Sequence, residues 1–147
     1  MFDCNDTITI WNRVKNNNSE TWHRLVIPVL CKYKTKITRS VSSTANGQSV
    51  DLSNSQTVII PMNDIKAVRA YIIPEKWHNI TDNERAGKFT VQENDMIALG
   101  EHMTEITGIQ PYRLSDLQNG IRNCFIIKSI KDNTRSRMGK HFKIEGV

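Results

Sequence analysis

The chain has 147 residues, a formal net charge of +5 at pH 7 and an apolar share of 38%. This length fits one hydrophobic core, so we expect residues 1–147 to form a single domain. No stretch approaches the roughly 20 apolar residues of a membrane helix, and residues 1–6 lack the basic and apolar regions of a secretion signal, so we expect a cytoplasmic product with no membrane partner.

The first half of the sequence predicts strands. Residues 7–11 alternate polar and apolar side chains, many of them β-branched, and the Asn-rich residues 16–19 predict a turn. Residues 21–38 are the longest extended segment, and Pro28 predicts an edge or a bulge within it. One face of this strand is expected in the core and the other in solvent. The core face would carry Cys31, Tyr33, Thr35 and Ile37, and the solvent face Lys32, Lys34 and Lys36.

A polar tract follows in residues 40–56, which contain almost only Ser, Thr, Asn, Gln, Gly and Asp. Unstructured loops longer than about 12–15 residues are uncommon in compact domains. Our hypothesis is a long hairpin or arm that becomes ordered against a neighbouring subunit, and a disordered surface loop is the alternative.

The second half predicts further short strands. Residues 57–60 form one that Pro61 ends, residues 89–91 and 96–99 suggest a hairpin, and residues 125–130 and 141–144 give two more. Residues 63–71 fit a helix or an extended segment equally well. Residues 115–118 predict a short helix with Ser115 as its N-cap. The expected fold is mainly β: a small β-barrel or sandwich with one or two short helices and a long polar loop.

Motifs for catalysis or for metal binding are not found. The sequence has no P-loop, no nucleophile elbow and no paired-histidine zinc motif. Its three cysteines, Cys4, Cys31 and Cys124, are too widely spaced for a zinc site and odd in number, so we interpret them as reduced thiols. Carboxylates lie next to His78 and His102, but adjacent residues on a strand point to opposite faces. We predict no enzyme activity, no metal and no cofactor.

Nucleic-acid binding is the alternative that the basic charge suggests. Residues 122–143 hold seven Lys or Arg side chains against Asp132 alone. A small nucleic-acid-binding β-barrel would stack bases on exposed aromatic side chains within a basic groove. The aromatic residues here fall mostly at strand positions and are core candidates first. They are Trp11, Trp22, Tyr33, Trp77, Phe89 and Phe125.

The order of several segments resembles small minor structural proteins of tailed bacteriophages and prophages of Gram-positive bacteria. The resemblance lies in residues 8–13, 21–24, 58–61, 88–100, 127–133 and 141–144. Residues 89–95 are similar to the family's aromatic-Thr-x-x-x-Gly-Asp pattern, with Phe89 where Trp is usual and Asn94 where Gly is usual.

The resemblance implies a head-closure (stopper) protein of the virion neck, assembled in the host bacterial cytoplasm. Such proteins are β-barrels in a homo-oligomeric ring between the portal or adaptor protein and the tail terminator or tail tube protein, with packaged DNA passing through the channel. A tail-completion or terminator protein is a related alternative. The residues expected to make inter-subunit or channel contacts are Ser43, Thr44, Asn46, Gly47, Gln48, Asp51, Arg135, Arg137 and Lys140.

Overall fold

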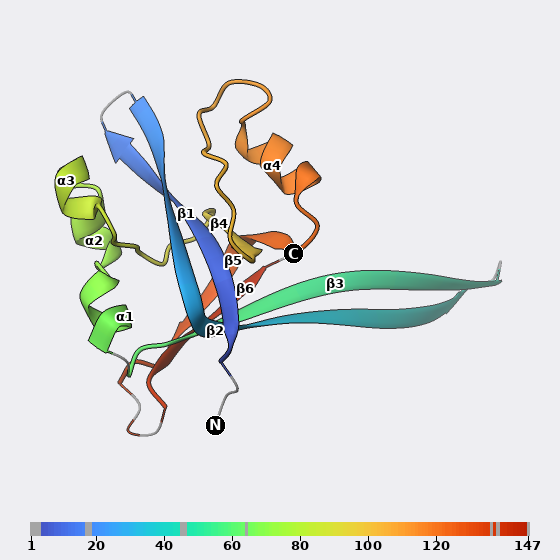
Figure 1. The fold of residues 1–147 in the computed structure, drawn as a ribbon. Coiled ribbons are helices and arrows are strands. Elements are labelled where there is room, and N and C mark those ends of the chain that lie inside the picture. The colour runs from blue at the N-terminus through green and yellow to red at the C-terminus, as the bar shows by residue number, and fades with distance from the viewer. Residues whose placement is uncertain are drawn as a thin grey trace.

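Six antiparallel strands close into a barrel in the computed structural model, which describes residues 4–16, 19–44, 47–63, 65–135, 137 and 139–146 (Figure 1). The strands follow one another around the barrel in the order β1-β2-β3-β6-β5-β4, and β4 pairs with β1 to close it. The predicted mainly β barrel is therefore confirmed. The strands are β1 (Asp6–Asn16), β2 (Ser19–Thr44), β3 (Gly47–Pro61), β4 (Met96–Leu99), β5 (Cys124–Asp132) and β6 (His141–Gly146).

Alternating apolar side chains fill the barrel. Ile8 and Ile10 of β1 are fully buried in the main core, whereas Trp11, the next residue, packs outside the barrel in a second cluster beneath helix α4 (Leu114–Gly120). This period of two is what the sequence predicted for residues 7–11. Ile97, Phe125 and Ile144 complete the interior from three other strands.

The long strand β2 pairs with two different strands along its length. Its first half pairs with β1, and from Lys32 onward it pairs with β3. The register shifts where Thr7 of β1 stands opposite residues 28–30, which confirms the predicted irregularity at Pro28. Cys31 and Tyr33 are buried and Lys34 and Lys36 are exposed, as predicted. Thr35, expected on the core face, is exposed, because it pairs with Gln56 at the point where β2 and β3 leave the barrel. The side chain of Ile37 lies outside the described part of the structure.

Four short helices lie among the described residues, which is more than the one or two predicted. Three follow β3, as α1 (Ile65–Ala70), α2 (Pro74–Trp77) and α3 (Asp82–Arg85), and Figure 1 shows them on the same side of the barrel. Residues 63–71, left open by the sequence, therefore contain a helix. Helices α2 and α3 have four residues each, too few to produce a recognisable hydrophobic period.

Two local predictions were wrong. Residues 89–91 do not pair with 96–99: β4 pairs with β1 and β5, and Phe89 makes only an isolated parallel bridge with Tyr71. Helix α4 begins earlier than predicted, with Arg113 as its N-cap residue, and the Asp116 carboxylate accepts a hydrogen bond from the Arg113 backbone N–H at 3.1 Å. Ser115 is therefore inside the first turn. Leu117 of this helix is buried in the second cluster, against the barrel.

Candidate functional site

The most distinctive feature is a two-stranded arm that projects from the barrel. We define the arm as residues 36–44 of β2 and 47–55 of β3, nine successive pairs from Lys36–Ser55 to Thr44–Gly47. The last barrel partners are Cys31, which pairs with Asp6, and Gln56, which pairs with Gly146. Nine residues per strand span about 30 Å. Figure 1 shows the arm extending well clear of the remaining described residues.

The polar tract of the sequence is this arm, so the hairpin alternative matches the structure; its contact with a neighbouring subunit stays a prediction. Five of the expected contact residues lie at or near its tip: Ser43, Thr44, Gly47, Gln48 and Asp51. Asn46, also expected there, lies outside the described residues.

The register of the arm sorts its residues onto two different faces. Val41 pairs with Val50, and Ile37 and Leu52 occupy register positions of the same face, which continues the interior face of the barrel. Arg39, opposite Leu52, and Asn54, opposite Ile37, are the polar positions among them. The other face carries small or polar residues at its register positions, which are Thr38, Ser40, Ser42, Thr44, Gly47, Ser49, Asp51 and Ser53. The four apolar residues look isolated in the sequence, because only strand pairing places them on one face.

Both long edges of the arm lack a neighbouring strand in the described part of the chain. Each edge therefore presents backbone N–H and C=O groups, the pattern to which another chain adds a strand. At the base, Gln56 Nε2 donates a 3.0 Å hydrogen bond to the Cys124 carbonyl, which fixes the point where the arm leaves the barrel. The arm is thus anchored at one end and open to a partner along its length.

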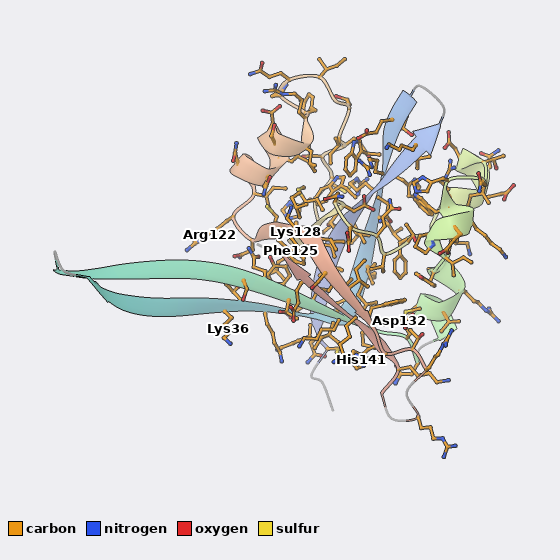
Figure 2. All side chains as sticks on the ribbon, turned by 180° about the vertical axis from the view of Figure 1, so that it is seen from behind. Lys36, Arg122, Phe125, Lys128, Asp132 and His141 are labelled. Carbon is orange, nitrogen blue, oxygen red and sulfur yellow. The ribbon has the colours of Figure 1, made fainter. Side chains whose placement is uncertain are left out.

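The basic loop between β5 and β6 lies elsewhere. Arg135, Arg137 and Lys140 are exposed, as the sequence led us to expect. Figure 2 shows Asp132 and His141, at the two ends of this loop, remote from Lys36 at the base of the arm. The structure therefore does not bring the two predicted contact regions together within one subunit, so they would meet only across a boundary between subunits.

A buried polar cluster closes the edge of β1 beyond β4. The side-chain Nδ2 of Asn12 donates to the Thr90 carbonyl and to Asp95 Oδ2, both at 2.8 Å, and its Oδ1 accepts from the Thr90 N–H. Asp95 Oδ1 accepts from the Arg13 N–H at 3.2 Å. Burial raises the pKa of Asp95 to about 7, against the opposing effect of hydrogen bonds from Asn12, Gln92 and Arg13. This cluster explains why residues 89–95 follow the barrel without forming a strand.

The turn before Asp95 requires a left-handed backbone. Asn94 has φ of 71°, a left-handed conformation that favours Gly and that Asn tolerates better than most residues. Asn94 therefore suits this turn better than most side chains would.

Trp77 packs against the β1–β2 hairpin on the side of α2 and α3. Its side chain is fully buried, its Nε1 donates to the Arg13 carbonyl at 3.1 Å, and the Arg85 guanidinium lies 5.7 Å from its ring centre. Arg85 donates to the Trp77 carbonyl and pairs with Asp82, both at 2.8 Å. His23 meets the Trp77 ring edge-on, and burial lowers the pKa of His23. These groups hold the helices in place, and none forms a nucleophile–base pair.

His78 and His102, which follow carboxylates in the sequence, make hydrogen bonds that support the fold. His78 Nδ1 accepts from the Lys15 N–H at 3.2 Å, so Nε2 carries the proton and donates to Gln92 Oε1. His102 Nε2 contacts the Leu99 carbonyl at 2.9 Å. Among the described residues, no group of three His, Cys, Asp or Glu side chains could hold a metal ion. Cys4, Cys31 and Cys124 are not joined by disulfide bonds, and burial raises the pKa of Cys31.

Comparison with known proteins places the chain in a family. A model described as a family of unknown function, DUF6751, matches residues 3–147. The chain belongs to the DUF6751 family. No curated protein and no solved structure matches it. No helix among the described residues of this DUF6751 member is long and apolar enough to span a membrane. Because the family has no assigned function, the arm of this chain is the feature from which we argue a function.

Proposed function

We propose that this protein is a structural subunit of a homo-oligomeric ring, and that the ring belongs to the neck of a tailed-phage particle. The arm is the observation that carries the first part. The phage assignment is supported by the resemblance of residues 8–144 to minor structural proteins of tailed phages.

An isolated two-stranded ribbon is at best marginally stable in water. This arm has nine residue pairs, two open edges and a row of apolar positions on one face. Each property is unfavourable for a ribbon left in solvent, and each becomes favourable when a second surface covers it. In an oligomer, a neighbouring copy of the chain supplies such a surface. These properties of the arm therefore favour a role in assembly.

The placement of the two expected contact regions suits a ring. The arm and the loop around Arg135 and Arg137 lie in different parts of the subunit (Figures 1 and 2). When the arm of one copy reaches the body of the next, the contact joins two different surfaces. Contacts of this kind repeat around an axis and give a closed ring when the rotation closes. In a neck ring, the remaining faces would meet the portal or adaptor protein and the tail terminator or tail tube protein.

The first experiment removes the arm. Lys36 and Ser55 pair directly, so an Asn-Gly turn replacing residues 37–54 joins them as a two-residue hairpin loop. We expect the full chain to form a discrete ring and the shortened chain to be a folded monomer, measured by analytical ultracentrifugation. A full chain that is monomeric at all concentrations and in the particle would contradict the proposal.

A pair of matched variants tests the face of the arm. Val41→Asp with Val50→Asp charges the apolar row, and Ser42→Asp with Ser49→Asp adds the same charge at the adjacent pair on the other face. The first double variant should abolish assembly, and the second should leave it nearly unchanged. Equal losses in both would show that the apolar row is not what the partner covers.

The neck assignment has its own test. Electron microscopy of particles made without this gene should show tailless heads that have lost their DNA beside finished free tails. DNA-filled heads beside abnormal tails would move the protein to tail completion, and intact tailed particles would overturn the assignment.

A further inference from the structure

The outer face of the sheet β2–β3–β6–β5 carries a concentration of lysines that the ring proposal does not use. Lys32 pairs with Ile59, Ile59 with Lys143, and Lys143 with Lys131, so these residues form one row across four strands. In the next row, Lys34 pairs with Thr57, Thr57 with Glu145, and Glu145 with Ser129. Lys36 lies one row further, on the arm.

A bulge in β5 adds another lysine to this face. The register shifts between Ile127 and Ser129, which leaves the exposed Lys128 beside Ser129 at the end of the second row. We define the lysine face as the outer-face lysines of these rows. They are Lys32, Lys34, Lys36, Lys128, Lys131 and Lys143.

Among the described residues of these rows, Glu145 is the only carboxylate, and it lies 3.3 Å from Lys143. The lysine face is therefore strongly positive. Exposed carboxylates lie elsewhere on the subunit, for example at Glu75, Asp82 and Glu84 on the side of the helices. The concentration of lysines on one face gives a polyanion a preferred side of approach.

The dimensions fit a phosphate backbone. Strands in a sheet are about 4.8 Å apart, so Lys32 and Lys131, three strands apart, are separated by about 14 Å along the sheet. Lys32 and Lys36 are four residues apart on β2, or about 13 Å. Duplex DNA carries one negative charge per about 1.7 Å of its axis, so a surface of this size meets several phosphates at once.

The chemistry of the lysine face distinguishes duplex from single-stranded nucleic acid. Binding of single strands relies on exposed aromatic side chains on which bases stack. The rows of the lysine face contain Lys, Ser, Thr, Ile and Glu. The aromatic residues in the strand segments that form this sheet lie in the main core instead; they are Tyr33, Phe125 and Phe142. Lysine offers point charges to phosphates and no sequence readout.

We propose that the lysine face of the β2–β3–β6–β5 sheet binds the phosphate backbone of duplex DNA without sequence preference. This surface is separate from the apolar row of the arm and does not depend on the ring or the phage assignment. In a neck ring, it would be the side of the subunit that meets the DNA passing through the channel.

The test measures binding of purified protein to a 30-base-pair duplex by fluorescence anisotropy over a series of salt concentrations. Lys34→Gln, Lys128→Gln and Lys131→Gln are combined in one variant. The control variant combines Lys15→Gln, Arg69→Gln and Lys76→Gln, which removes the same charge from exposed residues outside the lysine face. Circular dichroism establishes that both are folded.

We expect the affinity of the wild type to fall steeply with salt. Each lost phosphate contact lowers the slope of log K against log salt concentration by about 0.9, so the lysine-face variant should lose up to about 2.7 from its slope. Its affinity near 100 mM salt should fall by about 10-fold or more, and the control should stay within about 3-fold of wild type.

Four outcomes would overturn the proposal: no binding by the wild type at 20 mM salt, equal losses in both variants, tighter binding to an oligo-dT single strand than to the duplex, or tighter binding to phosphatidylserine vesicles. The ring proposal is judged separately, because the lysine-face variant is still expected to assemble.

Discussion

The barrel and the arm are made from the same two strands, yet different forces stabilise them. Within the barrel, β2 and β3 bury Cys31, Val58 and Ile60 in a shared core. Beyond Gln56 the two strands pair only with each other in the described residues. A continuous ladder of hydrogen bonds therefore does not by itself define a stable unit, since hydrogen bonds contribute little net free energy without burial. The barrel should therefore determine stability, and the arm should determine association.

The largest effect on stability should come from Trp77, which joins the helices α2 and α3 to the β1–β2 hairpin. Trp77→Ala removes a fully buried ring and its hydrogen bond to the Arg13 carbonyl. We expect the free energy of unfolding to fall by about 3–5 kcal/mol, measured by urea denaturation. Tyr112→Ala, at a residue that is 48% exposed, is the control and should change it little. A small effect of Trp77→Ala would mean that α2 and α3 are not part of the cooperative unit.

Asp95 makes the stability of the barrel depend on pH. Because its pKa is raised from 3.8 to about 7, the folded state holds this proton over a range where the unfolded chain has released it. Stability from this group is thus present below pH 4 and is lost as the pH rises to about 7. Relative to Asp95→Asn, the wild type should lose about 4 kcal/mol between pH 4 and pH 8.

Asp132 is the control for this pH dependence, because its contribution to stability changes with pH in the opposite direction. Hydrogen bonds from Thr134 lower the pKa of Asp132, so its contribution is lost as the pH falls. Asp132→Asn should therefore reduce stability only above the lowered pKa. If Asp95→Asn and the wild type had parallel pH profiles, the carboxyl would be ionised in the barrel throughout.

A smaller effect is expected where β6 passes close to β5. A Cβ atom on Gly146 would lie 2.1 Å from the Ile126 carbonyl oxygen and 2.3 Å from a ring carbon of Phe125. Gly146→Ala should destabilise the barrel by about 1–3 kcal/mol, as overpacking generally does. At Gly120, at the end of α4, an added Cβ meets nothing within 4 Å. Gly120→Ala should be neutral or slightly stabilising, and a similar loss at both sites would contradict this explanation.

The smallest effect on stability should follow from deleting the arm. Replacing residues 37–54 by Asn-Gly leaves the buried barrel residues unchanged, so the unfolding free energy of the monomer should change by less than about 1 kcal/mol. Urea denaturation at a concentration where both chains are monomeric makes the comparison. A loss comparable to that of Trp77→Ala would show that the arm belongs to the barrel's cooperative unit.

Most barrel strands were predictable because polar and apolar residues, many of them β-branched, alternate along them. Alternation identifies such strands without knowledge of their partners, as in residues 7–11 and in the lysine row of β2. The false hairpin at residues 89–91 arose because Phe89 and Val91 enter the core as they would in a strand, whereas the backbone of Thr90 bonds to the side chain of Asn12, which is distant in sequence. Periodicity carries no information about such contacts.

The functional surfaces were predictable only in part. The composition of residues 40–56 indicated an arm, but its apolar row requires the pairing of Val41 with Val50. The lysine face likewise joins Lys34 with Lys131 and Lys143, which are about 100 residues away in sequence. Each lysine alone looks like an ordinary solvent-exposed residue, and the sheet register makes them one surface.

The continuity of β2 has a mechanical consequence. This strand runs for 26 residues from the β1–β2 turn, through the barrel wall, to the tip of the arm. Hydrogen bonds in a ladder lie perpendicular to the strands, so a pull along the arm loads those between β2 and β1, and between β3 and β6, in shear and all together. Tension on the tip is thereby distributed over the barrel wall, and a subunit joined through its arm would resist extension as one body.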